Sequence, residues 1–331
     1  MKTAIDCLPC FLKQALYTAR LATSSQEIQQ RIMLAVTQYL TQPDFDRSPP
    51  ENAVPLYNLI AEISGNPDPF RHLKQQSNQA AMDLRSGVSG KIRNAENKIL
   101  AALKFAIAGN IIDYGSHQDF DIESTLAHCL DRDFTVNDYE LFQKDLDQAG
   151  NILYLADNCG ELVFDACFIE QLNNNITLAV KERPIINDAC LEDARFCGID
   201  KICRTITNGT NCPGTPPGRC SSEFEKAFQQ ADLIISKGQG NFETLSDQPG
   251  PIYFLLTVKC PVVAEHVQAQ TGRAINVQPG DMILMRGNTE KKIEPQRHRE
   301  HREHREKIAG IVFPWERLQP RFYFGFRCRL D

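Results

Sequence analysis

The spacing of apolar residues changes along the chain. Up to about residue 110, apolar positions recur every three or four residues, which is typical of amphipathic helices. Pro43, Pro49, Pro50 and Pro55 break this pattern. The stretches with the helical period are residues 10–16, 28–40, 72–84 and 95–108. We therefore expect the first third of the chain to be helical.

Short apolar runs take over after residue 150. The runs read as strands are residues 151–156, 176–180, 232–236 and 252–258, and a helical stretch over 162–172 separates the first two. Buried strands that alternate with helices indicate a mostly parallel sheet covered on both faces. Residues 274–277 and 282–285 predict a late hairpin or edge strands. The predicted fold is α/β, with a helical N-terminal domain and a three-layer α/β/α domain.

The C-terminal segment has a different pattern. Residues 298–306 repeat His-Arg-Glu three times, and a three-residue repeat cannot keep one face of a helix apolar. His298, His301 and His304 could bind a metal ion, although a solvated repeat is the simpler interpretation. We predict a helical domain over 1–115, an α/β/α domain over 116–287 and an atypical basic tail over 288–331.

Composition limits the classes of function. The 331 residues are 42% hydrophobic and 24% charged, which is ordinary for a globular protein. No apolar run reaches the roughly 18 residues that span a bilayer, and the N-terminus does not resemble a signal peptide. We therefore expect a cytoplasmic protein with no membrane association. The net charge of -6 argues against nucleic-acid binding, and the twelve cysteines, with no export signal, predict buried thiols. The oligomeric state stays open.

Polar clusters follow each of the four main predicted strands. Asp157 and Asn158 follow the first, residues 181–188 the second, residues 237–241 the third, and Lys259 closes the fourth. Ligands of open parallel sheets bind at the carboxyl ends of the strands. The repeated placement predicts a binding site along this edge.

The residue types in these clusters suit a divalent metal and a phosphate ester. Asp157, Asn158 and Asp188 offer oxygen ligands, which suit Mg²⁺ or Mn²⁺ and also Co²⁺ or Ni²⁺. Lys237 and Lys259 could neutralise phosphoryl oxygens, and the turn at Gly238 could offer backbone N–H groups. The alternative for Asp157 and Asn158 is a helix N-cap that needs no metal.

Cys7 and Cys10 form a lone CxxC pair. Such a pair is half of a zinc site or a redox pair, but two packed cysteines explain it equally well. Other cofactor and catalytic motifs are missing, because the sequence contains no Gly-x-Gly-x-x-Gly fingerprint at 238–243, no phosphate-binding Walker A motif and no Gly-x-Ser-x-Gly elbow.

At these residues the chain resembles the damage-control phosphatases, formerly the domain of unknown function 89, which are related to acidic-residue methyltransferase-like proteins. The resemblance covers roughly residues 1–286, and the CxxC pair indicates the prokaryotic branch. The motifs that carry it, in order, are Cys-Leu-Pro-Cys at 7–10, Gly-Asn-Pro-Asp-Pro-Phe at 65–70, Ala-Gly-Asn-Ile-Ile-Asp at 108–113, Asp-Asn-Cys-Gly-Glu at 157–161, Lys181 with Pro-Ile-Ile-Asn-Asp at 184–188, Lys-Gly-Gln-Gly-Asn at 237–241 and Lys-Cys-Pro at 259–261.

The resemblance implies a Rossmann-like α/β/α domain and a divalent-metal phosphatase acting on sugar phosphates or damaged phosphometabolites. It implies that Asp157, Asn158 and Asp188 hold the metal, with Asp157, Asn158 and Lys259 catalytic. It further implies that the substrate-binding residues are Asn110, Asp113, Glu161, Lys237, Gly238 and Asn241. The segment before Lys259 lacks the arginine of the eukaryotic branch, and the tail beyond residue 287 has no counterpart in the family.

Two other functions compete with the phosphatase. In one, the CxxC pair binds a metal or acts in redox chemistry while the cleft senses a ligand without turnover. In the other, the chain is a methyltransferase. That reading ranks last, because the loop after the first strand has a single glycine, Gly160, where a glycine-rich cofactor loop is needed.

Overall fold

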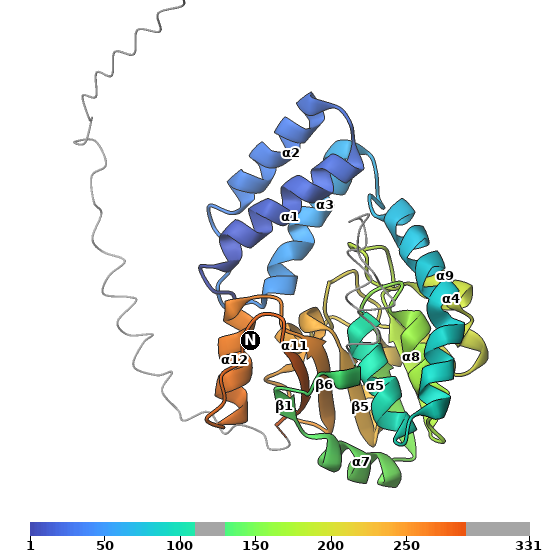
Figure 1. Cartoon of the computed structure of the whole chain (residues 1–331). Coiled ribbons are helices and arrows are strands. Elements are labelled where there is room, and N and C mark those ends of the chain that lie inside the picture. Colours follow the sequence, from blue (N-terminus) through green and yellow to red (C-terminus); the bar gives the residue numbers. More distant parts are fainter. Residues whose placement is uncertain (110–129, 289–331) are drawn as a thin grey trace, which may run out of the picture. The chain divides into compact units, whose positions relative to one another are not determined.

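The computed structural model describes residues 1–109 and 130–288 (Figure 1). The chain divides into two units, Met1–Lys291 and Lys292–Asp331, and every described residue belongs to the first. Asn110, Asp113 and the His-Arg-Glu repeat lie outside the described residues, as does the predicted boundary between residues 115 and 116. The division into domains therefore stays a prediction.

Three helices at the N-terminus share a hydrophobic core of their own. They are α1 (Cys7–Ala22), α2 (Gln26–Tyr39) and α3 (Pro49–Ser64). Ala15, Ile32 and Ile60 are fully buried in this core. The helices lie together as the blue part of Figure 1.

The start of α3 corrects the prediction that the prolines interrupt the helical pattern here. Ser48 and Glu51 form a capping box, and Pro49 occupies the first helical position. A proline at that position loses no hydrogen bond, because the first N–H groups of a helix have no partner within it. Pro49 therefore begins a helix, and Pro55 is accommodated inside it.

A seven-stranded sheet forms the centre of the rest of the unit, in the order β1-β7-β6-β5-β2-β3-β4. The strands are β1 (Val136–Asn137), β2 (Asn151–Leu155), β3 (Asn175–Val180), β4 (Arg204–Thr207), β5 (Leu233–Lys237), β6 (Ile252–Thr257) and β7 (Met282–Arg286). The five strands from β6 to β4 are parallel, whereas β7 is antiparallel to β6 and pairs in parallel with β1. The predicted mostly parallel sheet is confirmed.

Two strands escaped the sequence pattern and one predicted strand was wrong. β1 and β4 lie at the two edges of the sheet, where a strand needs few apolar residues. Residues 274–277 form no strand; they lie in the connection between α12 (Pro261–Thr271) and β7.

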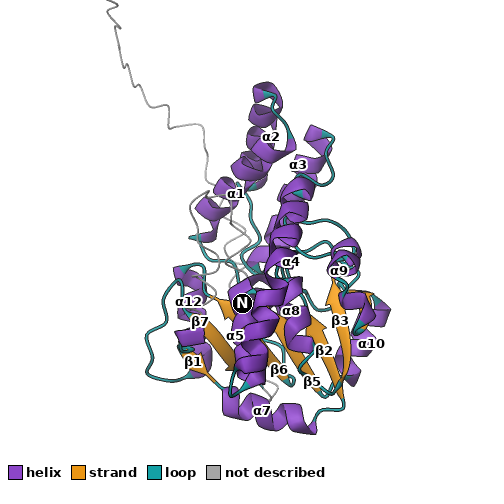
Figure 2. Cartoon of the chain, turned by 45° about the vertical axis from the view of Figure 1, so that its right-hand side comes forward, coloured by secondary structure: helices purple, strands orange, loops and turns teal. Residues whose placement is uncertain are grey.

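Both faces of the sheet are covered, which confirms the three layers (Figure 2). Ile152 and Tyr154 of β2 point into one core, and Leu153 and Leu155 point into the other, as expected for alternating strand positions. The helices that contribute to the first core are α4 (Arg71–Asn94), α5 (Lys98–Ala108), α7 (Tyr139–Gln148), α8 (Leu162–Ile169) and α9 (Leu191–Cys197). Those of the second core are α10 (Ser222–Gln230), α11 (Gln239–Leu245) and α12.

The strand order places a switch point beside β2. From β2 the chain moves outward through β3 and β4, then returns to the other side of β2 with β5 and β6. Crevices in parallel sheets open at the carboxyl ends of such strands.

Helix α3 approaches the loop that follows β4, where Asn211 donates to Asn58 over 3.4 Å and Arg219 lies 3.5 Å from Glu51.

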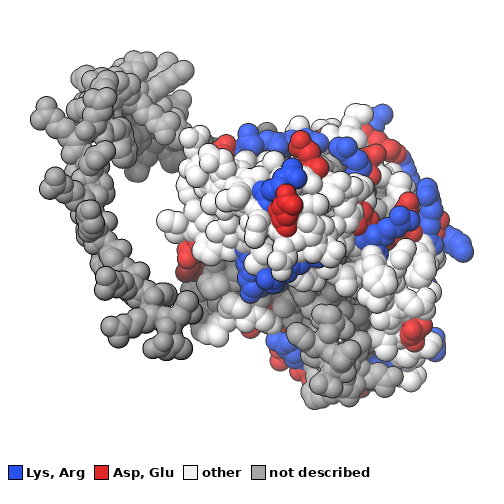
Figure 3. Space-filling view, turned by 90° about the horizontal axis from the view of Figure 1, so that it is seen from above, with Lys and Arg blue, Asp and Glu red and all other residues white. Residues whose placement is uncertain are grey.

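Charged side chains are distributed over the described surface without a large patch of one sign in the view from above (Figure 3). Among the described helices, none combines the length and the apolar character needed to cross a membrane.

Candidate functional site

A two-segment backbone bridge brings Asn158 and Asp188 together. The N–H of Cys159 donates to the carbonyl of Asn187 over 2.9 Å, and the N–H of Ala189 donates to the carbonyl of Asp157 over 2.9 Å. In this antiparallel arrangement the facing residues Asn158 and Asp188 form a non-hydrogen-bonded pair, whose Cα atoms lie about 4.5 Å apart with the side chains on one side. The loops after β2 and β3 thus hold these two side chains as neighbours.

Asp157 joins them through side-chain and backbone contacts. The amide nitrogen of Asn158 donates to Oδ2 of Asp157 over 2.9 Å. On its other side the Asp157 carboxylate lies against Gly238, where an added Cβ would stand 2.0 Å from the carboxyl carbon. The predicted ligands therefore meet at the carboxyl-terminal side of the sheet, between the ends of β2, β3 and β5. They are Asp157, Asn158 and Asp188.

Strain in the backbone accompanies this arrangement. Ile186, two residues before Asp188, has a φ of 40°. A β-branched side chain at positive φ is an outlier that costs of order 1–3 kcal/mol, and such residues cluster at functional sites.

Burial and mutual repulsion govern the two carboxyl groups. Asp157 is 8% exposed and Asp188 is 1% exposed. Burial, together with the nearby charges of Glu161 and Asp188, raises the pKa of Asp157 well above its ordinary value. Burial also raises the pKa of Asp188 to about 6, against the opposing effect of Lys181.

Lys181 is a buried residue of the site to which sequence reasoning gave no role of its own. Its ammonium group donates to the carbonyl of Gly214 over 2.7 Å and lies 3.6 Å from Oδ2 of Asp188. The signal for it was its position directly after β3, at the start of the polar cluster.

Lys237 sits in a buried ion cluster. Its ammonium group donates to the carbonyl of Ala106 over 2.9 Å, to Oδ1 of Asp165 over 2.7 Å and to Oε1 of Glu161. Tyr154 also donates to Asp165, over 2.6 Å. An ammonium group has three N–H donors, so all of those of Lys237 are in use. Contact with a substrate would require one of these partners to be exchanged, and the predicted role stays a prediction.

Glu161, Gly238 and Asn241 surround the same strand ends. Glu161 accepts from the amide of Asn158 over 3.3 Å. The N–H of Gly238 donates to the carbonyl of Leu255 over 2.9 Å, so this donor belongs to the sheet. Gly238 takes part in the site by allowing the close approach of Asp157.

Asn241 ties two strand ends to a loop. Its amide nitrogen donates to the carbonyls of Ala156 and Lys237 over 3.1 and 2.8 Å, and its oxygen accepts from Thr215 over 2.8 Å. Asn241 is 1% exposed and its side chain is fully engaged in this clamp, so its predicted contact with substrate stays a prediction.

Lys259 is exposed and lies two residues after the end of β6. Its backbone N–H donates to the side chain of Gln239 over 2.9 Å, and its charge lowers the pKa of both Asp157 and Asp188 against the effect of burial. An exposed cation that acts on both carboxyl groups is suited to attract an anionic substrate.

The CxxC pair lies near Glu243 and Cys260, whose charges act on both thiols. Cys7 begins α1 and is half-buried, while Cys10 is exposed. Burial raises the pKa of both thiols, which favours the unreactive protonated form. Neither a metal site nor a redox role for Cys7 and Cys10 is tested by this geometry.

The donor set at residues 157, 158 and 188 fits a divalent cation. Oδ2 of Asp188 is buried and accepts no hydrogen bond from the described residues. Lys74, which pairs with Asp193 over 2.7 Å, is a further buried ammonium group that acts on Asp188. The buried side chains here are thus five carboxylates and three ammonium groups, which leaves a formal charge of -2 when all are ionised; they are Asp157, Glu161, Asp165, Asp188 and Asp193 with Lys74, Lys181 and Lys237. Over residues 1–109 and 130–288, no three His, Cys, Asp or Glu side chains assemble into a metal-binding group, so the set depends on the amide of Asn158.

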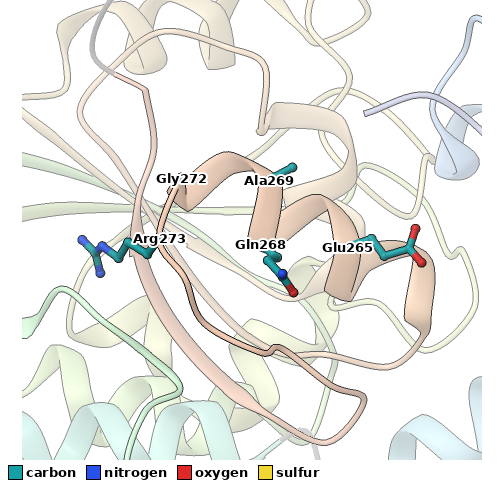
Figure 4. A pocket seen from close by; sticks show the side chains of 5 residues that line it. All are labelled: Glu265, Gln268, Ala269, Gly272 and Arg273. Carbon is teal, nitrogen blue, oxygen red and sulfur yellow. The ribbon is translucent and has the colours of Figure 1, made fainter.

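A shallow cavity elsewhere on the surface shares none of these residues. It lies on and just after α12, encloses about 370 Å³ and is lined by five residues (Figure 4). The lining residues are Glu265, Gln268, Ala269, Gly272 and Arg273. The side chains of Glu265 and Arg273 extend in opposite directions, so the cavity gathers no set of converging polar groups.

Comparison with known proteins supplies the family. The model of the damage-control phosphatase ARMT1-like domain matches residues 3–275. The damage-control phosphatase PH1575 of Pyrococcus horikoshii is 35% identical over 293 residues, which cover 86% of this chain and 98% of that protein. A damage-control phosphatase of Archaeoglobus fulgidus is 32% identical, with 86% and 98% covered.

A solved structure agrees with these matches. The crystal structure of a DUF89 family protein from Pyrococcus horikoshii superposes with a TM-score of 0.78 at 34% identity, covering 87% of this chain and all of that one. The prokaryotic CxxC branch stays a prediction. The fold and the matched residues together show that this chain belongs to the family of ARMT1-like damage-control phosphatases.

Proposed function

We propose that the chain is a metal-dependent phosphomonoesterase that hydrolyses small phosphometabolites, either sugar phosphates or damaged phosphate esters. The observation that carries the proposal is the backbone bridge that faces Asn158 with Asp188 while Asp188 keeps a buried oxygen without a hydrogen bond from the described residues. Family membership supports the phosphatase class, and the oxygen donor set supports the metal.

Asp157, Asn158 and Asp188 would hold the cation, which we expect to be Mn²⁺, Mg²⁺, Ni²⁺ or Co²⁺. A divalent cation bound there supplies Lewis acidity toward a phosphoryl oxygen and acidifies a water molecule. The excess negative charge of the buried side chains favours a divalent over a monovalent cation.

The chain's own residues would orient and neutralise the substrate. Lys259 would pair with a phosphoryl oxygen, and its exposure and its electrostatic effect on Asp157 and Asp188 support this role. Lys181, buried beside Asp188, keeps part of the carboxylate charge compensated before a cation arrives. Nothing among these contacts selects the organic part of the substrate.

The test is hydrolysis of p-nitrophenyl phosphate by the full chain with Mn²⁺, Mg²⁺, Co²⁺ and Ni²⁺ in turn, with a chelator as the blank. We expect cation-dependent release of phosphate that Asp157→Ala and Asp188→Ala abolish. Retained activity in both variants would reject the metal assignment. A panel of sugar and nucleotide phosphates then separates the substrate classes.

The competing CxxC module predicts a different result. It requires stoichiometric zinc or iron that Cys7→Ser removes, with no turnover of any phosphate ester. Phosphatase activity that survives Cys7→Ser and Cys10→Ser excludes it.

A further inference from the structure

Glu161 spans the gap between the candidate site and the buried ion cluster. It stands at the N-cap of α8 and is 1% exposed. Its Oε2 accepts from the amide nitrogen of Asn158 over 3.3 Å, while its Oε1 accepts from the ammonium group of Lys237. One carboxylate therefore binds two partners, one through each of its oxygens.

The amide of Asn158 faces carboxylate oxygens with its nitrogen. It donates to Oδ2 of Asp157 over 2.9 Å as well as to Glu161. Turning the amide by half a rotation would place its oxygen against two carboxylate oxygens, which repel it. Asp157 and Glu161 together dictate which end of the amide points away from them. Only the oxygen end can ligate a hard divalent cation.

Lys237 holds Glu161 in the orientation that this requires. Its remaining N–H groups donate to Asp165 over 2.7 Å and to the carbonyl of Ala106 over 2.9 Å, so the ammonium group is fixed from three sides. A buried ion pair contributes little net stability, because desolvation offsets the attraction. Fixing one arrangement of side chains is the better-attested use of such a group.

We propose that Glu161 is a positioning residue, which orients the amide of Asn158 so that its oxygen, not its nitrogen, is presented to a divalent cation. The inference rests on the proposed metal-dependent function. It assigns Glu161 a role through Asn158 rather than through contact with the substrate. Lys237 supports that role by binding the other oxygen of the same carboxylate.

The variant that tests it is Glu161→Gln, which keeps the size of the side chain and removes its charge. A side-chain amide has a single acceptor oxygen, for which Lys237 and Asn158 then compete. If Lys237 binds that oxygen, the NH₂ group of Gln at residue 161 faces the amide nitrogen of Asn158. Two donors then face each other, so the amide of Asn158 turns over and presents its nitrogen to the cation. Asp165→Asn is the matched control, because Asp165 accepts from the same Lys237 and from Tyr154, and the substitution likewise removes one charge while keeping the size of the side chain.

The measurement is the dissociation constant of Mn²⁺ from the full chain, by calorimetry or by the paramagnetic signal of free Mn²⁺. We expect Glu161→Gln to weaken the binding of Mn²⁺ about tenfold or more. Loss of a residue that orients a metal ligand by a hydrogen bond lowers metal affinity by about that factor. Asp165→Asn should stay within about threefold of the wild type, even where its melting temperature falls. Equal binding by Glu161→Gln and the wild type would overturn the inference, and so would equal weakening by both variants.

A double variant covers the case in which Glu161→Gln folds poorly. Asn158→Asp combined with Glu161→Gln exchanges donor and acceptor across the contact and retains an oxygen ligand at residue 158. We expect it to bind Mn²⁺ more tightly than Asn158→Asp alone. No gain over the single variant contradicts the inference. A wild type that binds none of Mn²⁺, Mg²⁺, Co²⁺ and Ni²⁺ would instead defeat the proposed function, so the two failures are distinguishable.

Discussion

The carboxyl group of Asp157 lies so close to Gly238 that a Cβ added to the glycine would stand 2.0 Å from both the carboxyl carbon and Oδ2. Gly238 also has a φ of 79°, which side chains rarely allow. Two independent reasons thus require glycine at the end of β5, and both concern the position of a candidate metal ligand.

Gly238→Ala should therefore displace Asp157 and cost more than 2 kcal/mol of unfolding free energy, since overpacking and positive φ add. We expect Mn²⁺ binding and phosphatase activity to fall at least tenfold. Gly87→Ala is the control, because an added Cβ there meets no atom within 4 Å and the residue lies within α4. It should leave binding unchanged and stabilise the helix slightly. Urea unfolding and calorimetry of both variants decide the matter.

Asn241→Leu should destabilise the protein by about 3 kcal/mol. The substitution keeps the number and branching of the side-chain heavy atoms but leaves the carbonyls of Ala156 and Lys237 without their donor, and each buried group left unpaired costs about 1–3 kcal/mol. Asn175→Ala, at the exposed start of β3, should cost less than 1 kcal/mol. Similar urea midpoints for the two variants would argue against the clamp.

Tyr154→Phe and Tyr253→Phe form a matched pair. Tyr154 donates to the fully buried Asp165 over 2.6 Å, whereas Tyr253 donates over 2.8 Å to the half-buried Asp145. Water can replace the lost hydroxyl only at Asp145. We expect a loss of about 2 kcal/mol for Tyr154→Phe and below 1 kcal/mol for Tyr253→Phe in denaturant unfolding. The reverse order would mean that Lys237, which donates to the same oxygen of Asp165, satisfies it without the hydroxyl.

Stability should fall with rising pH because of Glu243. Burial raises the pKa of this carboxyl group to about 7, from 4.5 in an exposed setting. The folded state thus binds the proton more tightly than the unfolded state, and the resulting stabilisation, complete below pH 4.5, is lost as pH rises through 7. Glu243→Gln removes this dependence. Its unfolding free energy relative to wild type should increase by about 2 kcal/mol between pH 5 and pH 8. A constant difference across that range would contradict the shifted pKa.

Cation binding should raise the melting temperature of the wild type. A ligand that binds only the folded state stabilises it by about 2.7 kcal/mol at a concentration one hundred times its dissociation constant. Mn²⁺ should therefore shift the thermal transition upward, and a chelator should return it. Asp188→Asn should keep its fold and lose the shift. An equal shift in this variant would place the ion elsewhere on the chain.

Sequence periodicity predicted the part of the fold in which burial dominates. Fully buried runs such as those of β5 and β6 read clearly as strands, and the rule for carboxyl ends of parallel strands brought Asp157 and Asp188 together. Sequence periodicity failed for β4, which is short and polar at the edge of the sheet. It also failed for α3, because Pro49 stands at the first position of the helix, where a proline begins a helix rather than breaking one.

Side-chain direction was harder to predict than position. Lys237 was expected to face a substrate because it ends a strand. Yet Leu233 and Ile235, which share its face of β5, both point into the core that contains Tyr154. Alternation along the strand therefore indicates that Lys237 turns toward α5 and α8. The polar partners of Lys237 are Glu161 and Asp165, which belong to the N-cap and first turn of α8. The pattern of residues within β5 gives no indication of them.

The meeting of Asp157, Asp188 and Gly238 at three strand ends also bears on how the protein folds. Parallel strands pair only after long crossovers close, so these residues become neighbours late and at a considerable entropic cost. Before the strands pair, the metal ligands on different strand ends would not yet be close enough together to bind a cation. It would act on the finished architecture, slowing its unfolding rather than seeding its assembly.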